Sequence, residues 1–283
     1  MKKVAILTDS TAYLPQDQME KYGISSVPLA VIWGEETFED GITITPEEFY
    51  IRLKTAKIMP STSQPSVGKM QDAFKVLLDQ NYEVLGIFIS SKLSGTMQSA
   101  LQAQEMLPKR SKVEVLDSET TTLAMGFQVL AAARAAADGA SLDECRAMAE
   151  QARQKSGVYF MVDTLEFLYR GGRIGGGARF LGTALNMKPI LYMHNGKIES
   201  LERVRTKGKA LDRLIELVAE KCAGKTPIRL ASSHATSPEE AETLVAKAKE
   251  RLNPVETIIG ELSPVIGSHV GPGTVALAYM AGM

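Results

Sequence analysis

The sequence has little cysteine and no excess of charge of either sign. Its 283 residues include only two cysteines, Cys145 and Cys222, which excludes a small domain held together by several disulfide bonds. The 32 Lys and Arg residues nearly balance the 33 Asp and Glu residues, for a formal net charge of −1, and this balance argues against nucleic acid as a partner. Because 45% of the residues are hydrophobic, the chain is not disordered and can form a large core.

The apolar run near the start of the sequence is short. The run at Val4–Leu7 is followed by Thr8 and Asp9 and is shorter than the roughly 7–15 residues of a signal-peptide core, so we interpret it as a first β-strand. The segment Leu262–Met283 has no charged side chain, but its prolines and glycines would leave backbone groups unpaired in a bilayer. We therefore expect this tail to be buried inside the protein, the two thiols to be reduced and the protein to be cytoplasmic.

Motifs for nucleotides, metals and common hydrolases are absent from the sequence. It contains no Gly-x-Ser-x-Gly, no His-Glu-x-x-His and no paired Cys-x-x-Cys, so an α/β-hydrolase or a zinc site has no motif support. Gly224–Thr226 resembles the end of a phosphate-binding loop, but Ala219 stands where its first glycine should be. Gly271–Gly273 lies too near the end of the sequence for the βαβ unit of a dinucleotide site. We expect no cofactor, no metal and no nucleotide site.

Strand-like and helical patterns alternate along the first half of the chain. Short apolar runs bounded by turn residues are typical of buried strands, and the segments between them have helical periodicity. The expected strands are 4–8, 24–33, 84–90 and 113–117, and the expected helices are 46–55, 67–80, 96–107 and 123–138. Helices between apolar strands predict a parallel sheet. Ser141, followed three residues later by Glu144, predicts a further helix that begins with a capping box.

The second half of the chain has a different order of elements. The expected strands are 158–162, 189–193, 197–203, 228–232 and 256–261, and the expected helices are 207–223 and 238–251. Asn195-Gly196 between two strand-like runs predicts a β-hairpin. We therefore expect an α/β protein of two domains, with a parallel sheet in residues 1–160 and a mixed sheet in residues 161–283.

Loops rich in hydroxyl groups remain as candidates for a binding site. They are Asp9–Thr11, Ser61–Ser66, Ser90–Thr96 and Asp117–Thr120. Most of them follow predicted strands, where open α/β sheets bind ligands. Serine and threonine in such places usually cap helices, and this is our interpretation of Ser66 and Thr96. Thr62 stands well before its helix, and Ser94 precedes a glycine that permits close approach, so we expect these two hydroxyls to bind an anion such as a carboxylate.

Three arginine or histidine side chains are further candidates for the site, and two histidines are not. Arg173 lies in a glycine-dense loop, and His269 lies in the uncharged tail. Each of these two side chains either contacts a ligand or has a structural role, and the sequence leaves both alternatives open. Arg205 would ordinarily be a solvated residue at the start of a helix. His194 and His234 are expected to be exposed and without a functional role.

The hydroxyl-rich loops belong to a longer series of motifs that spans almost the whole chain. The series is Asp9–Ala12, Thr62–Ser66, Ser90–Thr96, Thr164–Ile174, Asn186–Leu191, Val204–Thr206 and His269–Thr274. One such motif would be weak, but the series in this order resembles the DegV family of bacterial fatty-acid-binding proteins. Tyr13 and Met97 depart from the pattern of that family. Met97 is close to Ser94 in the sequence, and we expect it to influence the preference for an acyl chain.

The resemblance implies a fold shared with one subunit class of dihydroxyacetone kinases. This fold has an N-terminal three-layer domain with a parallel sheet and a C-terminal two-layer α/β domain with a mixed sheet. The resemblance also implies one long-chain fatty acid in a tunnel between the domains, with its carboxylate on Thr62 and Ser94 and the C-terminal tail at the interface. Arg173, Arg205 and His269 match family positions tied to contact with the ligand or a partner.

The resemblance further implies a carrier and not an enzyme. In the family, a separate ATP-dependent fatty acid kinase subunit converts the bound acid to an acyl phosphate, and exchange of lipid with the membrane surface is possible. Two alternatives stay open. One is an acyl hydrolase or acyltransferase that uses Ser94 or Ser10 as nucleophile and His269 as base, with Asp9 or Asp117 to orient it. The other is a scaffold in which the lipid is only structural.

Overall fold

The computed structural model describes residues 3–180 and 187–283. Its strands are β1 (Val4–Asp9), β2 (Ser25–Val27), β3 (Ala30–Trp33), β4 (Glu36–Glu39), β5 (Ser61–Ser63), β6 (Glu83–Phe88), β7 (Val113–Asp117), β8 (Ser156–Met161), β9 (Lys188–His194), β10 (Lys197–Val204), β11 (Ile228–His234), β12 (Glu256–Glu261) and β13 (Val275–Ala281). Its α-helices are α1 (Gln16–Tyr22), α2 (Pro46–Leu53), α3 (Val67–Asp79), α4 (Thr96–Glu105), α5 (Thr122–Ala137), α6 (Leu142–Lys155), α7 (Glu166–Arg170), α8 (Lys207–Cys222), α9 (Pro238–Leu252) and α10 (Pro264–Val270). Two 3₁₀ helices, η1 (Ser10–Ala12) and η2 (Gly175–Phe180), complete the set.

The first sheet is parallel and is covered on both faces. Its strand order is β2-β1-β6-β7, and every residue of β1 is buried, as expected for a parallel strand. Successive side chains of a strand point to opposite faces. Ala5 and Leu7 accordingly pack in the core beneath α3 and α4, whereas Val4 and Ile6 pack in the core that contains α5. The apolar side chains of β1 thus pack against helices on both faces of the sheet.

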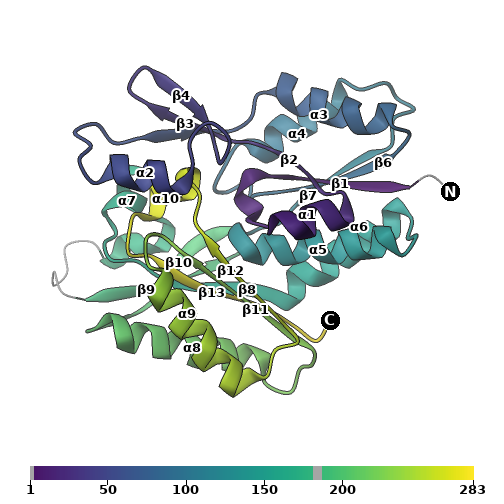
Figure 1. Cartoon of the computed structure of the whole chain (residues 1–283). Coiled ribbons are helices and arrows are strands. Elements are labelled where there is room, and N and C mark those ends of the chain that lie inside the picture. The colour runs from purple at the N-terminus through teal and green to yellow at the C-terminus, as the bar shows by residue number, and fades with distance from the viewer. Residues whose placement is uncertain (1–2, 181–186) are drawn as a thin grey trace.

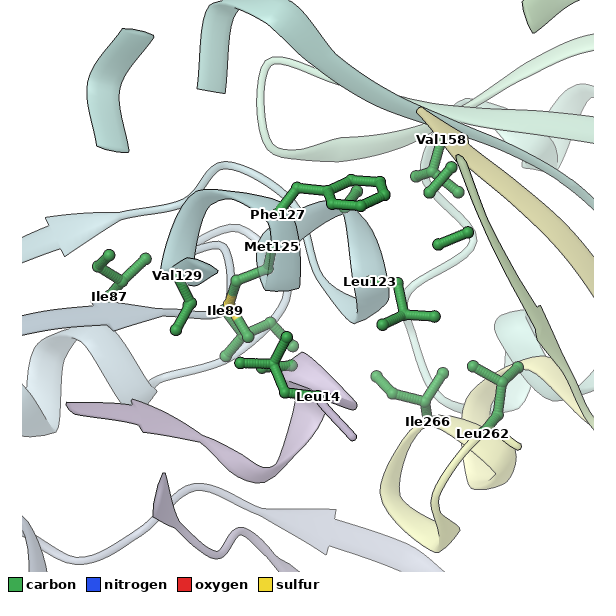
Figure 2. Packing of buried hydrophobic residues seen from close by; sticks show 14 of the residues in the cluster. Leu14, Ile87, Ile89, Leu123, Met125, Phe127, Val129, Val158, Leu262 and Ile266 are labelled. Carbon is green, nitrogen blue, oxygen red and sulfur yellow. The ribbon is translucent and has the colours of Figure 1, made fainter. Parts of the chain in front are cut away.

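The helix α5 lies between two sheets. Leu123 to Ala133 are buried without interruption, and such a helix, apolar on all sides, must be enclosed by protein. The helix contacts β1 and β6 of the parallel sheet and β8, β11 and β13 of the second sheet. In Figure 2, Phe127 points toward the strand that carries Val158, while Val129 lies on the side of Ile87.

The second sheet is mixed, with strand order β10-β9-β8-β13-β11-β12. Its outer face packs against α8 and α9, which contribute Leu214 and Leu244 to a separate core cluster. The predicted hairpin is confirmed: β9 and β10 pair antiparallel, and Asn195 and Gly196 both have positive φ, 48° and 79°. Two positive φ angles are what a type I′ turn requires.

The helices and sheets stack in alternating layers. From top to bottom in Figure 1 these are α3 and α4, the parallel sheet, α5 and α6, the mixed sheet, and α8 and α9. This arrangement confirms the predicted α/β class with a parallel and a mixed sheet. The boundary expected near residue 160 falls inside β8, a strand of the mixed sheet, and the division into two domains remains a prediction.

The single strand predicted over residues 24–33 is wrong. The segment forms β2 in the parallel sheet and β3 in a separate three-stranded sheet of order β4-β3-β5. Pro28 lies between them, and proline has no N–H with which to continue a ladder of hydrogen bonds.

The loop predicted at Ser61–Ser66 is also partly wrong, because Ser61–Ser63 forms β5 and pairs with β3. That pairing joins residues about 30 positions apart, which local patterns cannot report.

The uncharged C-terminal segment is buried, as predicted. Its last strand, β13, lies in the interior of the mixed sheet between β8 and β11, and all but one residue of α10 is buried. Across the described ranges, none of the helices combines the length and the apolarity that a membrane crossing needs. Both cysteines are buried free thiols.

Candidate functional site

A largely apolar cavity lies where the small sheet, the loop after β6 and α10 meet the inner face of the mixed sheet. Its empty space is about 830 Å³ when the part open to solvent is included. Its walls are formed by Leu29, Thr62, Ser63, Gln64, Ile89, Leu93, Ser94, Thr121, Thr122, Val158, Phe160, Leu168, Arg173, Met193, Ile198, Leu262, Val265, Ile266, His269, Val270, Thr274 and Ala276. No Asp or Glu is among these lining residues, and Arg173 is their one fixed positive charge.

Thr62 and His269 are brought together from opposite ends of the chain. Thr62 lies in β5, where it pairs with Val31 of β3, and its Oγ1 is 2.7 Å from Nε2 of His269 in α10. Burial, reinforced by the positive charge of Arg173, lowers the pKa of His269 to about 4. The imidazole is therefore neutral at pH 7.

The other ring nitrogen of His269 is enclosed by the backbone near α7. Nδ1 is buried and has no hydrogen-bond partner within the described ranges. A Cβ placed on Gly171 would lie only 2.2 Å from this nitrogen. Glycine is therefore required at position 171 for the imidazole to pack here.

Ser94 lies in the loop between β6 and α4, close to the loop that follows Thr62. Its Oγ is 2.9 Å from Oγ1 of Thr96 and accepts the N–H of Thr96 at 3.3 Å. The next residue, Gly95, is covered by the side chain of Gln64, whose nitrogen would be 2.9 Å from a Cβ at this position. Gln64 thus joins the two loops, and both predicted hydroxyls border the same cavity.

Arg173 reaches the same region from the loop after α7. Its Nε donates to the carbonyl of Leu93 at 3.1 Å, and Nη1 donates to the carbonyl of Gly171 at 2.6 Å. Within residues 3–180 and 187–283, no carboxylate forms an ion pair with this guanidinium. Arg173 therefore supplies an uncompensated positive charge beside two hydroxyls and a neutral imidazole. Such a group of side chains favours an anion.

Other predicted residues lie elsewhere. Arg205 is exposed between β10 and α8 and does not line the cavity. His194 is exposed as expected, but the expectation for His234 is wrong, because this side chain is buried at the end of β11. Met97 packs in the core beneath α3 and α4 and is not among the cavity residues. Asn186, from the motif series, lies outside the described residues.

Several cavity residues were not singled out from the sequence. Met193 and Ile198 come from the two strands of the β9–β10 hairpin, and Val158 and Phe160 are alternate residues of β8. The alternation of β8 predicts that these two side chains share a face, but not what that face encloses. The hairpin is held over the cavity because the hydroxyl of Ser90 donates to the carbonyl of Gly196 at 2.7 Å.

The residues of the proposed hydrolytic triad are not assembled. His269 bonds to Thr62, and the hydroxyl of Ser10 donates to Asp40 at 2.7 Å. Neither Ser10 nor Ser94 forms a hydrogen bond with His269 in the described part of the chain. Among those same residues, no group of three or more His, Cys, Asp or Glu side chains is arranged to hold a metal ion.

The fold and the cavity define an α/β protein with a largely apolar, partly open cavity and an anion-favouring group of side chains in its wall. The chain belongs to the DegV family: the family described as "Uncharacterised protein, DegV family" matches residues 3–282. A DegV domain-containing protein of Streptomyces coelicolor is 37% identical over 274 residues, which cover 96% of each chain.

Solved structures agree with this assignment. A DegV family protein from Thermus thermophilus, described as fatty-acid binding, is 36% identical and superposes with a TM-score of 0.93 over 99% of both chains. DegV from Bacillus subtilis, described as a fatty acid binding protein, is 34% identical and has a TM-score of 0.90 over 99% of this chain and 100% of that one.

Proposed function

We propose that this protein binds a long-chain free fatty acid in the cavity and presents its carboxylate to a separate ATP-dependent fatty acid kinase. The observation that carries the proposal is the combination of apolar walls with Thr62, Ser94, Arg173 and His269 around one cavity. The relatives from Thermus thermophilus and Bacillus subtilis are described as fatty-acid binding, which supports the same ligand here.

A long acyl chain gains free energy from burial. Burial of each CH₂ group is worth about 0.8 kcal/mol, so a chain of roughly sixteen carbons gains on the order of 10 kcal/mol before the costs of ordering. A carboxylate without partners in a dry site would be expelled or neutralised. Hydroxyl donors from Thr62 and Ser94, aided by the charge of Arg173, remove that penalty.

The kinase step leaves the carrier itself unchanged. A carboxylate oxygen of the bound acid attacks the γ-phosphorus of ATP, an O–P bond forms, and the bond to the leaving ADP breaks. The carrier contributes position and not nucleotide binding, in keeping with the absence of a nucleotide motif from the sequence. Arg205 is exposed and lies outside the cavity, and we assign it to contact with the kinase.

The test is mass spectrometry of an organic extract from freshly purified protein. We expect a long-chain fatty acid in wild type and its loss from the Thr62→Ala/Ser94→Ala double variant, because the carboxylate then lacks its hydroxyl donors. Ser61→Ala/Thr37→Ala is the matched control, since both of these side chains are exposed and neither lines the cavity. Equal lipid occupancy in all three folded proteins would refute the assignment of the two hydroxyls.

The carrier role is tested with the lipid-loaded protein, ATP and a purified fatty acid kinase. We expect acyl phosphate, trapped as a hydroxamate, only when all three are present. Failure to form it would leave a lipid scaffold as the better description. Turnover of acyl esters that disappears in Ser94→Ala would instead support the hydrolase.

A further inference from the structure

The short helix α10 forms a large part of the cavity wall. It supplies Val265, Ile266, His269 and Val270 to the lining, and it lies beside α2 in the yellow part of Figure 1. It is only seven residues long, and a helix of this length is not stable without tertiary contacts. The shape of the cavity therefore depends on whatever holds α10 in place.

The N-terminus of α10 lacks a cap from its own residues. Ser263 occupies the N-cap position, but its side chain makes no bond to the helix. Its hydroxyl donates instead to Oδ2 of Asp40 at 2.7 Å. The other carboxylate oxygen of Asp40 accepts the N–H of Val265 at 3.0 Å, which is the bond that a cap would normally make.

Asp40 is itself firmly anchored. It directly follows β4, its backbone N–H donates to the carbonyl of Leu29 at 2.9 Å, and its carboxylate also accepts the hydroxyl of Ser10 at 2.7 Å. The residue is only 2% exposed. One carboxylate thus connects the segment after β1, the end of β4 and the start of α10.

We propose that Asp40 is a positioning residue for the ligand site: its carboxylate replaces the missing N-cap of α10 and so holds His269 and the apolar side chains of this helix against the cavity. This inference rests on the proposed binding of a fatty acid. Asp40 does not line the cavity. The inference therefore predicts that the rate of ligand release depends on hydrogen bonds made outside the cavity.

The charges around Asp40 predict how this contact responds to pH. Asp9 and Tyr13 face it from the β1 side, Tyr50 from α2 and Glu261 from β12. The described lining of the cavity beside Asp40 includes no Lys, Arg or His. Burial raises the pKa of Asp40 from 3.8 to about 6. The hydrogen bonds from Ser263 and Val265 lower this pKa, but burial outweighs them. If release of α10 exposes the carboxyl to water, the carboxyl binds its proton more tightly in the docked state, so docking strengthens as pH falls through about 6.

The experiment measures the exit of the fluorescent fatty acid cis-parinaric acid into excess phosphatidylcholine vesicles, together with hydrogen exchange of the α10 amides without ligand. Asp40→Ala leaves three donors unpaired, and we expect exit about tenfold faster and less protection of α10. Asp40→Asn keeps an acceptor and is neutral, so we expect slow exit that accelerates less than that of wild type between about pH 5 and about pH 8. Wild type should lose ligand faster at the higher pH.

Glu144→Gln is the control, because Glu144 completes a capping box at α6, which contributes nothing to the described lining. Its rate of ligand release and its α10 hydrogen exchange should equal those of wild type.

If Asp40→Ala does not fold, Ser263→Ala removes one of the same hydrogen bonds. It should change the rate of ligand release and the α10 hydrogen exchange in the same direction. If the folded variant releases the fatty acid at the wild-type rate, and if its α10 amides exchange hydrogen at the wild-type rate, the inference is wrong. A wild-type protein that takes up no cis-parinaric acid would refute the proposed function, while the exchange of α10 would still decide the role of Asp40.

Discussion

At the scale of single residues, the site depends on how burial alters the charge of His269. The folded protein lowers its pKa from 6.5 to about 4. A histidine kept neutral by burial contributes stability above its ordinary pKa, and this contribution is lost as pH falls from about 6.5 to about 4. The same burial makes the imidazole sensitive to any anion placed beside it.

We expect a bound fatty acid carboxylate to raise the pKa of His269, because a nearby negative charge stabilises the imidazolium. The measurement is an NMR titration of the imidazole signals with and without oleate. His194 is exposed and outside the cavity, so its NMR signals are the control and should not respond to oleate. If oleate binds, as judged by mass spectrometry, and the pKa of His269 does not move, the carboxylate is not beside Thr62.

At the scale of elements, α5 approaches η1 closely in the helix layer next to the parallel sheet. Gly126 lies in α5, and a Cβ at this position would be 2.8 Å from the carbonyl oxygen of Ala12 and 3.1 Å from the side chain of Leu14. The carbonyl is backbone and cannot rotate away as a side chain can.

Gly126→Ala should therefore lower the free energy of unfolding by about 1–3 kcal/mol, the usual cost of an overpacked core, although alanine is the better helix former. Chemical denaturation followed by circular dichroism measures this change. Gly208→Ala in the first turn of α8 is the matched control, because a Cβ there meets no atom within 4 Å, and this substitution should not destabilise the protein. Equal stabilisation by both substitutions would show that η1 moves aside freely.

At the scale of the whole molecule, α5 belongs to the cores of both sheets. Phe127 and Leu130 are almost fully buried in the cluster that also holds Ile87 and Val158, so neither sheet can lose α5 without exposing the other. We infer that the two halves of the chain unfold together.

Trp33, the one tryptophan in the sequence, lies in β3 of the small sheet in the first half of the chain, and β3 also contacts α10. We expect its fluorescence and the far-ultraviolet circular dichroism of the whole chain to give coincident unfolding curves. Phe127→Ala should shift both curves together, by about 3–5 kcal/mol. Separation of the two curves, in wild type or in the variant, would show that the halves are energetically independent.

Local features of this protein could be predicted because they depend on neighbours within a few residues. The capping box of Ser141 and Glu144 forms as expected, Asn195-Gly196 forms the hairpin turn, and the apolar run of β1 is a buried parallel strand. The hydroxyls of Thr62 and Ser94 were selected from the sequence and line one cavity, although their part in binding remains a prediction.

Sequence by itself determined the order and type of most helices and strands, because periodicity, caps and turns act over short distances. It also determined the family, because the series of motifs runs along almost the whole chain. Tertiary structure alone decided the contacts that shape the cavity. His269 meets Thr62 from 207 positions away, Asp40 caps α10 from 225 positions away, and His234 is buried by the packing around the end of β11. Such contacts arise when layers of helices and sheets close on one another, and no local pattern of residues encodes which side chains then become neighbours.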